Sequence, residues 1–355
     1  MTDSPVITAI RQTEQFLHLY QPPAINGNFK GKHIISVEQF HRQDLDMLYE
    51  VTKALRGRIV AHDRELVKLC EGRLMASLFF ESSTRTDMSF QAAMRRLGGS
   101  VVSASNGVQF SSVYKGENLA DTVRAAGCYA DIIVIRHPHI GSSYEAAYYL
   151  DRLNERITIP TTVISGGDGA GEHPTQALLD LFTITDLKNG PDNLTITLVG
   201  DLLYGRTVHS LAKLISLWGA QNTKLCLVSP PSLRIPDTVL DFIIKHGITV
   251  HETTDLYEVL GETDVLYWTR IQEERFARKA DYEAIRDNFI MTPAVLNQAK
   301  RDVILMHPLP RKHEMGTPHD HDILDQNPRS VYFQQMENGM FVRMALMAMV
   351  LGAAI

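Results

Sequence analysis

The tetrapeptide Ser-Thr-Arg-Thr at residues 83–86 brings three hydroxyl groups and one guanidinium group into a short stretch. It follows the apolar run 74–80, typical of a strand buried on both faces of a parallel sheet, and precedes 90–97, where apolar residues recur at helical spacing. Because the first N–H groups of a helix lack partners within it and its dipole is positive there, this junction can hold a phosphate or a carboxylate. An ordinary helix cap is the alternative, since Thr84 and Asp87 fit a capping box.

Arginine, histidine and glutamine side chains gather near the ends of several other apolar runs that we expect to be strands. In open α/β sheets ligands bind beyond the carboxyl ends of the strands, so cations and amides repeated there favour an anion site. Taken singly, each is more often a surface residue or a satisfied core residue. The groups are Arg136 after 132–135, His173 and Gln176 at the start of a helix expected over 174–185, Arg206 after 194–199, Arg270 and Gln272 after 265–267, and His-Pro-Leu-Pro-Arg at 307–311 after 303–306.

The glycine-bearing turn 200–207 does not fit a nucleotide site. Gly200 and Gly205 do not give G-x-G-x-x-G, and no G-x-x-x-x-G-K-[ST] phosphate loop occurs in the chain. Arg206 suits a carboxylate better than a pyrophosphate that needs close approach of glycine backbone.

The 14 histidines raise the question of a metal site, chiefly at His313, His319 and His321. These three fall in a segment rich in Asp, Gly and Pro that we expect to be a solvated loop, so a metal site is disfavoured. No H-E-x-x-H, paired C-x-x-C or G-x-S-x-G pattern supports zinc hydrolysis or serine esterase chemistry.

The segment 111–117 is a polar, glycine-containing stretch with a single cation, Lys115. A mobile loop that captures phosphate and a plain surface loop both fit this pattern. The residues alone leave the two readings open.

Composition is that of an ordinary globular protein. The 355 residues are enough for two cores, and the 44% hydrophobic and 21% charged residues show no bias toward disorder. A net charge of −6 argues against nucleic acid as the main partner, because binding a phosphate backbone needs a basic face.

Cysteine usage and apolar segments bear on the compartment. Cys70, Cys128 and Cys226 are odd in number and widely spaced, which fits a reducing compartment and buried thiols. The first residues do not read as a secretory signal. The apolar run 340–355 contains Arg343 and is shorter than the about 20 residues that span a bilayer, so we expect a buried helix and no membrane partner.

Strand candidates, which also include 162–164 and 225–228, alternate with helical patterns over most of the chain. This alternation predicts an α/β fold of two domains, each with a mainly parallel sheet flanked by helices. The glycine-dense stretch 166–171, followed by Pro174 at the first position of a helix, marks the expected junction. The expected parts are an N-terminal extension over 1–29, a first domain over 30–173, a second domain over 174–331, and a C-terminal helix over 332–355 that packs back on the first domain.

Several motifs together resemble the aspartate branch of the carbamoyltransferase family. T-R-I-Q at 269–272 and Pro308 point to that branch, because the ornithine branch usually has a cysteine at the latter position and an S-M-G segment that this sequence lacks. The likeness extends in the same order from about residue 30 to residue 352. The other motifs are S-T-R-T at 83–86, H-P-T-Q at 173–176, V-G-D-x-x-Y-G-R-T-V-H-S at 199–210 and H-P-L-P-R at 307–311.

The resemblance implies the carbamoyltransferase fold, with carbamoyl phosphate bound by the first domain and L-aspartate by the second. It implies transfer of the carbamoyl group to the amino group of aspartate, in pyrimidine biosynthesis, without a metal or a cofactor. The implied catalytic residues are Arg85, Thr86, Lys115, Arg136, His173 and Gln176. The implied carbamoyl phosphate site is Ser83, Thr84, Arg85, Thr86, Arg136, His173, Gln176, Pro308 and Leu309, and the implied aspartate site is Lys115, Arg206, Arg270, Gln272 and Leu309.

The resemblance also implies shared active sites. Ser111 and Lys115 would enter the site of the neighbouring chain, so a cytoplasmic homotrimer would be the smallest active unit. A regulatory chain or a dihydroorotase partner stays open. Two alternatives are kept: a carbamoyltransferase for another amino acid such as ornithine, and a catalytically silent scaffold relative.

Four residues depart from the pattern of the family. Ser82 stands where bacterial relatives commonly have proline, and Asp87 where arginine is frequent. We expect the Asp87 side chain to point away from the phosphate and to complement the helix dipole. Leu203 and Tyr114 stand where some relatives have lysine, which concerns the ionic contacts of domain closure rather than the chemistry.

Overall fold

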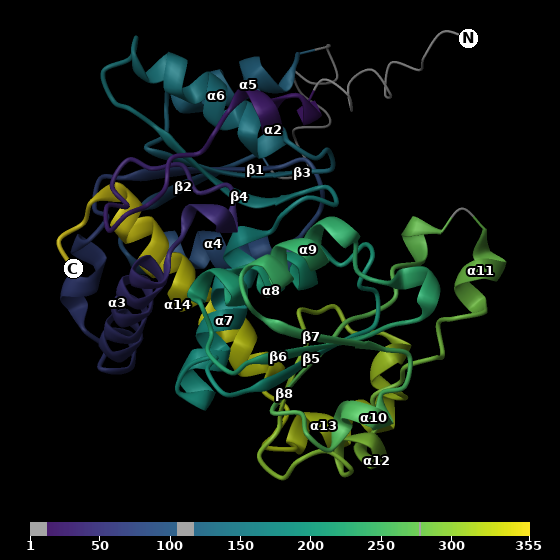
Figure 1. Cartoon of the computed structure of the whole chain (residues 1–355). Coiled ribbons are helices and arrows are strands. Elements are labelled where there is room, and N and C mark those ends of the chain that lie inside the picture. Colours follow the sequence, from purple (N-terminus) through teal and green to yellow (C-terminus); the bar gives the residue numbers. More distant parts are fainter. Residues whose placement is uncertain (1–12, 105–116, 277) are drawn as a thin grey trace, which may run out of the picture. The chain divides into compact units, whose positions relative to one another are not determined.

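The computed structural model describes residues 13–104, 117–276 and 278–355, which divide into two compact units (Figure 1). The first unit extends to Leu178 and also contains Gly339–Ile355, and the second is Leu179–Asn338. Two helices, α7 (Pro174–Lys188) and α14 (Tyr332–Leu351), each begin in one unit and end in the other. The unit boundaries therefore fall inside continuous helices, where no change in composition marks them.

The first unit is built on a four-stranded parallel sheet in the order β2-β1-β3-β4. Figure 1 shows α5 and α6 on one face of this sheet and α3 and α4 on the other. The strands are β1 (Leu74–Phe79), β2 (Ser100–Ser103), β3 (Ile132–His137) and β4 (Thr162–Asp168). The helices are α2 (Phe16–Leu19), α3 (Arg42–Val60), α4 (Thr84–Arg96), α5 (Leu119–Gly127) and α6 (Ser142–Asn154).

Small side chains let α5 and α6 pack closely. α6 buries Ala146, Ala147 and Leu150 completely, and these join a core that includes strand residues of β1, β3 and β4. A Cβ atom at Gly127 of α5 would lie 2.9 Å from the Leu150 side chain, so a larger residue would push the two helices apart. Burying one leucine completely contributes roughly 1.5–3 kcal/mol, so this layer holds the sheet rigid beneath the polar loops.

The second half of α14 completes the core of the first unit. Arg343, which is 3% exposed, donates from Nη1 to Ser89 Oγ at 2.9 Å and from Nη2 to Thr175 Oγ1 at 3.4 Å. Its guanidinium carbon lies 4.9 Å from the centre of the Phe90 ring. A buried guanidinium is costly without such partners, so Arg343 ties α14 to both α4 and the start of α7.

The second unit is built on a five-stranded parallel sheet in the order β7-β6-β5-β8-β9. Figure 1 shows α8 and α9 on one face and α10, α12 and α13 on the other. The strands are β5 (Thr195–Val199), β6 (Lys224–Val228), β7 (Thr249–Thr253), β8 (Val265–Trp268) and β9 (Ile304–Met306). The helices are α8 (Arg206–Trp218), α9 (Asp237–Lys245), α10 (Tyr257–Leu260), α11 (Lys279–Glu283), α12 (Pro293–Leu296) and α13 (Pro318–Gln326).

The predicted fold class is confirmed, and every apolar run predicted as a strand forms one. Two strands were not predicted, β2 and β7, and both are edge strands whose residues are mostly exposed or half-buried. Such strands lack the continuous apolar run that marks a strand covered on both faces.

Two local predictions were wrong. Cys128 is exposed, because it directly follows α5 at the surface, whereas Cys70 and Cys226 are buried as expected. Residues 318–322, expected to belong to a loop, lie in α13, because Thr317 and Asp320 make a capping box and Pro318 occupies the first helical position. Within the described part of the chain, no helix combines the length and the apolar character needed to cross a membrane.

Candidate active site

The junction at residues 83–86 joins β1 to α4. The helix begins at Thr84 with Ser83 as its N-cap residue, and the Ser83 side chain makes no capping hydrogen bond. The alternative of a capping box between Thr84 and Asp87 is therefore wrong, because the N-cap lies one residue earlier. The first turn of α4 presents N–H groups without acceptors in the helix, next to Arg85, as an anion site requires.

The Asp87 carboxylate, in the first turn of α4, is engaged by neighbouring side chains. Its Oδ1 accepts a hydrogen bond from Ser77 Oγ of β1 at 2.6 Å and another from Gln91 Nε2 at 2.8 Å. The carboxylate is therefore engaged by the strand below and by the next helical turn. In the first turn it complements the positive end of the helix dipole.

Arg136 lies near the end of β3, opposite Phe79 of β1 in the register of the sheet. The residue is 8% exposed, and its Nη1 donates to the Gly166 carbonyl at 3.1 Å. Its Nη2 lies 2.9 Å from Glu81 Oε2, an ion pair that orients the guanidinium group. Glu81 was not predicted as a site residue, although an acidic residue two positions before the S-T-R-T motif is a visible signal.

His137, next to Arg136, adds no charge to this edge of the sheet. Burial, together with the neighbouring His139, lowers the pKa of His137 to about 3. Its Nδ1 accepts a hydrogen bond from the His139 backbone N–H at 3.1 Å. Arg136 is therefore beside a neutral imidazole.

His173 directly precedes α7 and is 4% exposed. The loop before it is held by Asp168, whose Oδ1 accepts from the Glu172 N–H at 2.9 Å and whose Oδ2 accepts from the Gly141 N–H at 3.0 Å. Gln176 lies in the first turn of α7, and its N–H donates to the His173 carbonyl at 3.0 Å. Asp168 was not predicted, because its partner Gly141 lies far away in the sequence.

These first-unit residues share one edge of one sheet. The strands β1, β3 and β4 are adjacent and parallel, so the segments that follow them emerge at the same carboxyl end. The structure brings to this edge Ser83, Thr84, Arg85, Thr86, Arg136, His173 and Gln176.

In the second unit, Asp201 joins the turn before α8 to the segment after β8. It is fully buried, its Oδ1 accepts from the Tyr204 N–H at 2.9 Å, and its Oδ2 accepts from the Gln272 N–H at 3.3 Å. Burial raises the pKa of Asp201, and the backbone hydrogen bonds and the charge of Arg270 oppose that rise. Gln272 Nε2 closes the arrangement by donating to the Tyr204 carbonyl at 3.0 Å.

Gly200 allows these two segments to approach. Its φ is +116°, and a Cβ atom there would lie 2.3 Å from the Thr269 carbonyl oxygen. Arg206 is the first residue of α8, and its N–H donates to the Tyr204 carbonyl at 2.9 Å. Arg206 and Arg270 are thereby placed on the ends of neighbouring strands β5 and β8.

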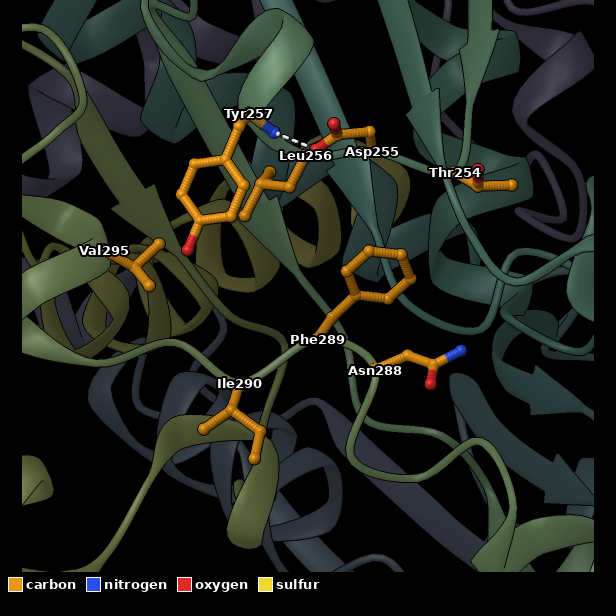
Figure 2. A pocket seen from close by; sticks show the side chains of 8 residues that line it. All are labelled: Thr254, Asp255, Leu256, Tyr257, Asn288, Phe289, Ile290 and Val295. Atoms are coloured by element: carbon orange, nitrogen blue, oxygen red, sulfur yellow. Dashed lines mark hydrogen bonds between the residues drawn. The ribbon is translucent and has the colours of Figure 1, made fainter.

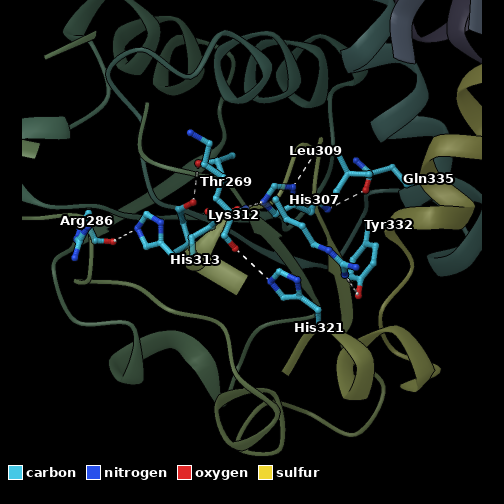
Figure 3. Close-up of polar contacts among 12 residues, drawn as sticks. Thr269, Arg286, His307, Leu309, Lys312, His313, His321, Tyr332 and Gln335 are labelled. Carbon is cyan, nitrogen blue, oxygen red and sulfur yellow. Dashed lines mark hydrogen bonds and ion pairs between the residues drawn. The ribbon is translucent and has the colours of Figure 1, made fainter. Parts of the chain in front are cut away.

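The segment after β9 carries Pro308 and Leu309. Leu309 has a positive φ of 56°, and its N–H donates to His307 Nδ1 at 2.9 Å (Figure 3). Because β5, β8 and β9 are adjacent and parallel, this segment emerges at the same carboxyl end as those that carry Arg206 and Arg270.

Two predicted site residues, Ser111 and Lys115, lie outside the described residues, as does Tyr114. The described residues contain no group of three or more His, Cys, Asp or Glu side chains that could hold a metal ion. Figure 3 shows His313 and His321 in separate contacts: His313 Nε2 lies 3.3 Å from the Arg286 carbonyl, and His321 Nε2 lies 3.3 Å from the Lys312 carbonyl.

A small pocket lies elsewhere in the second unit (Figure 2). Among the residues that line it are Asp255, Tyr257, Phe289 and Ile290, which follow β7 or precede α12. None of its eight lining residues is Lys, Arg or His, and none is a predicted site residue. The pocket therefore does not compete with the two sheet edges as a site for anions.

Comparison with known proteins matches both units. Residues 32–186 match the family described as aspartate/ornithine carbamoyltransferase, carbamoyl-P binding domain, and residues 192–350 match the aspartate/ornithine carbamoyltransferase, Asp/Orn binding domain. The chain is 43% identical over 326 residues to the aspartate carbamoyltransferase catalytic subunit of Clostridium perfringens, which covers 92% of this chain and 99% of that relative.

A second kind of relative is much longer. The chain is 47% identical over 326 residues to the multifunctional protein ura1 of Schizosaccharomyces pombe, covering 92% of this chain. It spans only 14% of the length of that protein, and the same share of the multifunctional protein CAD of Squalus acanthias.

Solved structures of aspartate transcarbamoylase also match this chain. Aspartate transcarbamoylase from Trypanosoma cruzi in complex with carbamoyl phosphate and aspartate superposes with a TM-score of 0.82 at 41% identity, covering 93% of this chain and 100% of that chain. The complex of the same enzyme with carbamoyl aspartate and phosphate gives 0.81 at 42% identity, covering 93% and 98%.

Proposed function

This chain belongs to the aspartate/ornithine carbamoyltransferase family, and we propose that it transfers the carbamoyl group of carbamoyl phosphate to the amino group of L-aspartate. The products are N-carbamoyl-L-aspartate and phosphate. One observation carries the proposal: each unit gathers guanidinium groups and hydrogen-bond donors at the carboxyl edge of its parallel sheet, in a chain 43% identical to a catalytic subunit of this activity.

The first unit takes the phosphate. The first turn of α4 supplies N–H groups, the Ser83 and Thr84 hydroxyls and the Arg85 guanidinium, which suit the three oxygens and roughly two negative charges of the phosphate. Arg136, oriented by Glu81, reaches the phosphate and the carbonyl side of the substrate. These contacts require neither a metal nor a covalent intermediate.

The carbamoyl group is polarised by hydrogen-bond donors. Thr86 and His173 donate to the carbonyl oxygen, where negative charge grows as the amine attacks, and Gln176 holds the carbamoyl NH₂ group. The amine nitrogen forms its bond to the carbonyl carbon, the bond from that carbon to the phosphate oxygen breaks, and the departing phosphate takes the amine proton. Positioning and charge stabilisation carry the reaction.

The second unit takes the amino acid. Arg206 and Arg270 match the two carboxylates of aspartate, and Gln272 assists. The backbone at Pro308 and Leu309 accepts hydrogen bonds from the carbamoyl and amino groups. Ornithine carries one carboxylate and a cationic side chain, so two arginines favour aspartate over it.

The proposed assembly is a homotrimer in the cytoplasm, with Ser111 and Lys115 entering the site of the neighbouring chain. The proposed pathway is pyrimidine biosynthesis, supported by the likeness to catalytic subunits and to longer multifunctional proteins. Those two kinds of relative differ in what accompanies the catalytic chain, so either a regulatory chain or a dihydroorotase partner is compatible with the sequence.

The test is an assay of the purified full chain with carbamoyl phosphate and either aspartate or ornithine, with the products identified by mass spectrometry. We expect N-carbamoyl-aspartate and phosphate in equal amounts, and no citrulline. Formation of citrulline alone would mean that the amino acid substrate is ornithine and not aspartate. Formation of neither product would support the alternative of a catalytically silent relative.

A further inference from the structure

His307 is enclosed in a set of hydrogen bonds that fixes its protonation state. The residue is 2% exposed, its Nδ1 accepts the Leu309 N–H at 2.9 Å, and its Nε2 lies 3.2 Å from Glu314 Oε1. A ring nitrogen that accepts a hydrogen bond carries no proton, and a carboxylate can only accept. The ring proton is therefore on Nε2 and is donated to Glu314.

Glu314 holds both ends of the segment that follows β9. The same oxygen, Oε1, also accepts from the Lys312 backbone N–H at 2.7 Å. Burial acts to raise the pKa of Glu314, but the hydrogen bonds from His307 and from the backbone act to lower it, and the pKa is lowered. An ionised Glu314 therefore fixes the His307 tautomer and closes the segment 307–312 into a loop.

The start of this loop is anchored to a second buried chain of polar groups. The His307 N–H donates to Gln335 Oε1 at 2.9 Å (Figure 3), and Gln335 Nε2 donates to Asp180 Oδ1 at 2.6 Å. The other oxygen of Asp180 accepts from the Tyr267 hydroxyl at 2.7 Å. Four elements, α7, β8, β9 and α14, thus fix where His307 sits.

The hydrogen bond to His307 holds Leu309 in a backbone conformation that leucine rarely adopts. The φ of Leu309 is +56°, in the left-handed region, which is costly for a residue with a side chain. The hydrogen bond from the Leu309 N–H to Nδ1 offsets part of that cost.

We infer that His307 is a positioning residue for the attack of the amine: its Nδ1 lone pair holds the Leu309 amide so that the Pro308 and Leu309 carbonyls orient the reacting amino group. This inference rests on the proposed function, which gives those carbonyls their role. The imidazole touches no substrate, and Glu314 acts by keeping the proton on Nε2 and by closing the loop through the Lys312 N–H.

Two substitutions of His307 test the roles of its two ring nitrogens separately. His307→Asn can place its side-chain oxygen where Nδ1 lies and keep the acceptor for Leu309, whereas His307→Gln can place its amide near Nε2 and keep the donor to Glu314. We expect His307→Gln to lower kcat on the order of 100-fold, and His307→Asn to stay within about 10-fold of the native chain. The KM for carbamoyl phosphate should change less than kcat in both, because the proposed phosphate contacts are made by Arg85 and Arg136 of the first unit.

Thr197→Val is the matched control for loss of a buried hydrogen bond in the same sheet. It removes the 2.6 Å bond to Thr263, at a distance along the chain from the loop. We expect it to lower Tm by about 4 °C with kcat unchanged. An equal loss of kcat in both His307 variants would mean that the residue has only a structural role. Native kcat in both variants would also overturn the inference.

The tautomer gives a readout that does not depend on the variants folding. The ¹⁵N chemical shifts of the His307 ring, assigned in the full chain labelled at histidine, should show the proton on Nε2. A proton on Nδ1 would overturn the inference whatever the kinetics. A native chain that fails to carbamoylate aspartate would instead contradict the proposed function, which the same assay tests first.

Discussion

Glu81 and Arg136 form an ion pair across the ends of neighbouring strands, with 2.9 Å between Oε2 and Nη2. The Arg136 side chain is 10% exposed and that of Glu81 is 36% exposed. This pairing, together with the hydrogen bond from Nη1 to the Gly166 carbonyl, sets the direction of the guanidinium group.

Glu81→Gln should lower kcat/KM for carbamoyl phosphate by on the order of 10-fold, because the neutral amide orients Arg136 less firmly. Steady-state kinetics against carbamoyl phosphate measure the effect. Glu262→Gln is the control, since it removes an exposed ion pair with Lys224 and should change nothing. Unchanged kinetics in Glu81→Gln would show that the ion pair does not orient the site.

Arg85→Ala and Arg270→Ala should separate the two substrates. Arg85→Ala should abolish turnover and weaken carbamoyl phosphate binding, whereas Arg270→Ala should mainly raise the KM for aspartate. Each lost charge-assisted contact corresponds to a loss of about 2–4 kcal/mol of binding free energy. Calorimetry measures carbamoyl phosphate binding, and kinetics measure the aspartate effect. Full activity in Arg85→Ala would contradict the phosphate site, and an unchanged aspartate KM in Arg270→Ala would contradict the amino acid site.

Mixing two inactive variants tests whether sites are shared between chains. Lys115→Ala and His173→Ala chains, dissociated and reassembled together, should regain part of the native activity, because some sites then combine an intact Lys115 with an intact His173. Mass measurement of the assembly confirms that mixed trimers form. Mixed trimers without activity would remove the shared site from the proposal.

The rate should rise with pH as the amino group of aspartate loses its proton, because only the neutral amine can attack. The measurement is kcat/KM for aspartate from about pH 6 into the alkaline range, because the amino group of a free amino acid is more basic than the α-amino group at the end of a peptide chain. A flat profile, under conditions where chemistry limits the rate, would argue against direct attack by the amine.

Glu314→Gln should change how stability depends on pH. Because folding lowers the pKa of Glu314, its contribution is fully present above the ordinary value of 4.5 and is lost as pH falls below that through the folded value. The free energy of unfolding of the native chain should therefore exceed that of Glu314→Gln at neutral pH, and the gap should narrow in acid. Urea unfolding at pH 7 and in acid measures it, and a constant gap would contradict the lowered pKa.

The sequence predicted most of the sheet because buried parallel strands are continuous apolar runs. It placed Arg85, Arg136, Arg206 and Arg270 near strand ends for the same reason, since the end of such a run is easy to see. The edge strands β2 and β7 escaped because exposed residues interrupt their apolar pattern.

The residues that orient the site could not be read in the same way. Asp168 is paired with the Gly141 N–H, and His307 with the Gln335 side chain, across long stretches of sequence. Pairings of this kind depend on how elements pack, which local periodicity does not encode. The Glu314 contact with His307 is close in sequence, but an acidic residue seven positions away carries no pattern of its own.

The position of Arg343 has a consequence for how the chain is made. The first unit needs Gly339–Ile355 for its core, yet this segment follows all of the second unit in the chain. A ribosome therefore releases Phe90 and Thr175 long before the cation that packs against them. Until then the part of the first unit that α14 covers lacks its partner, so the core of the first unit cannot be completed before the second unit has been synthesised.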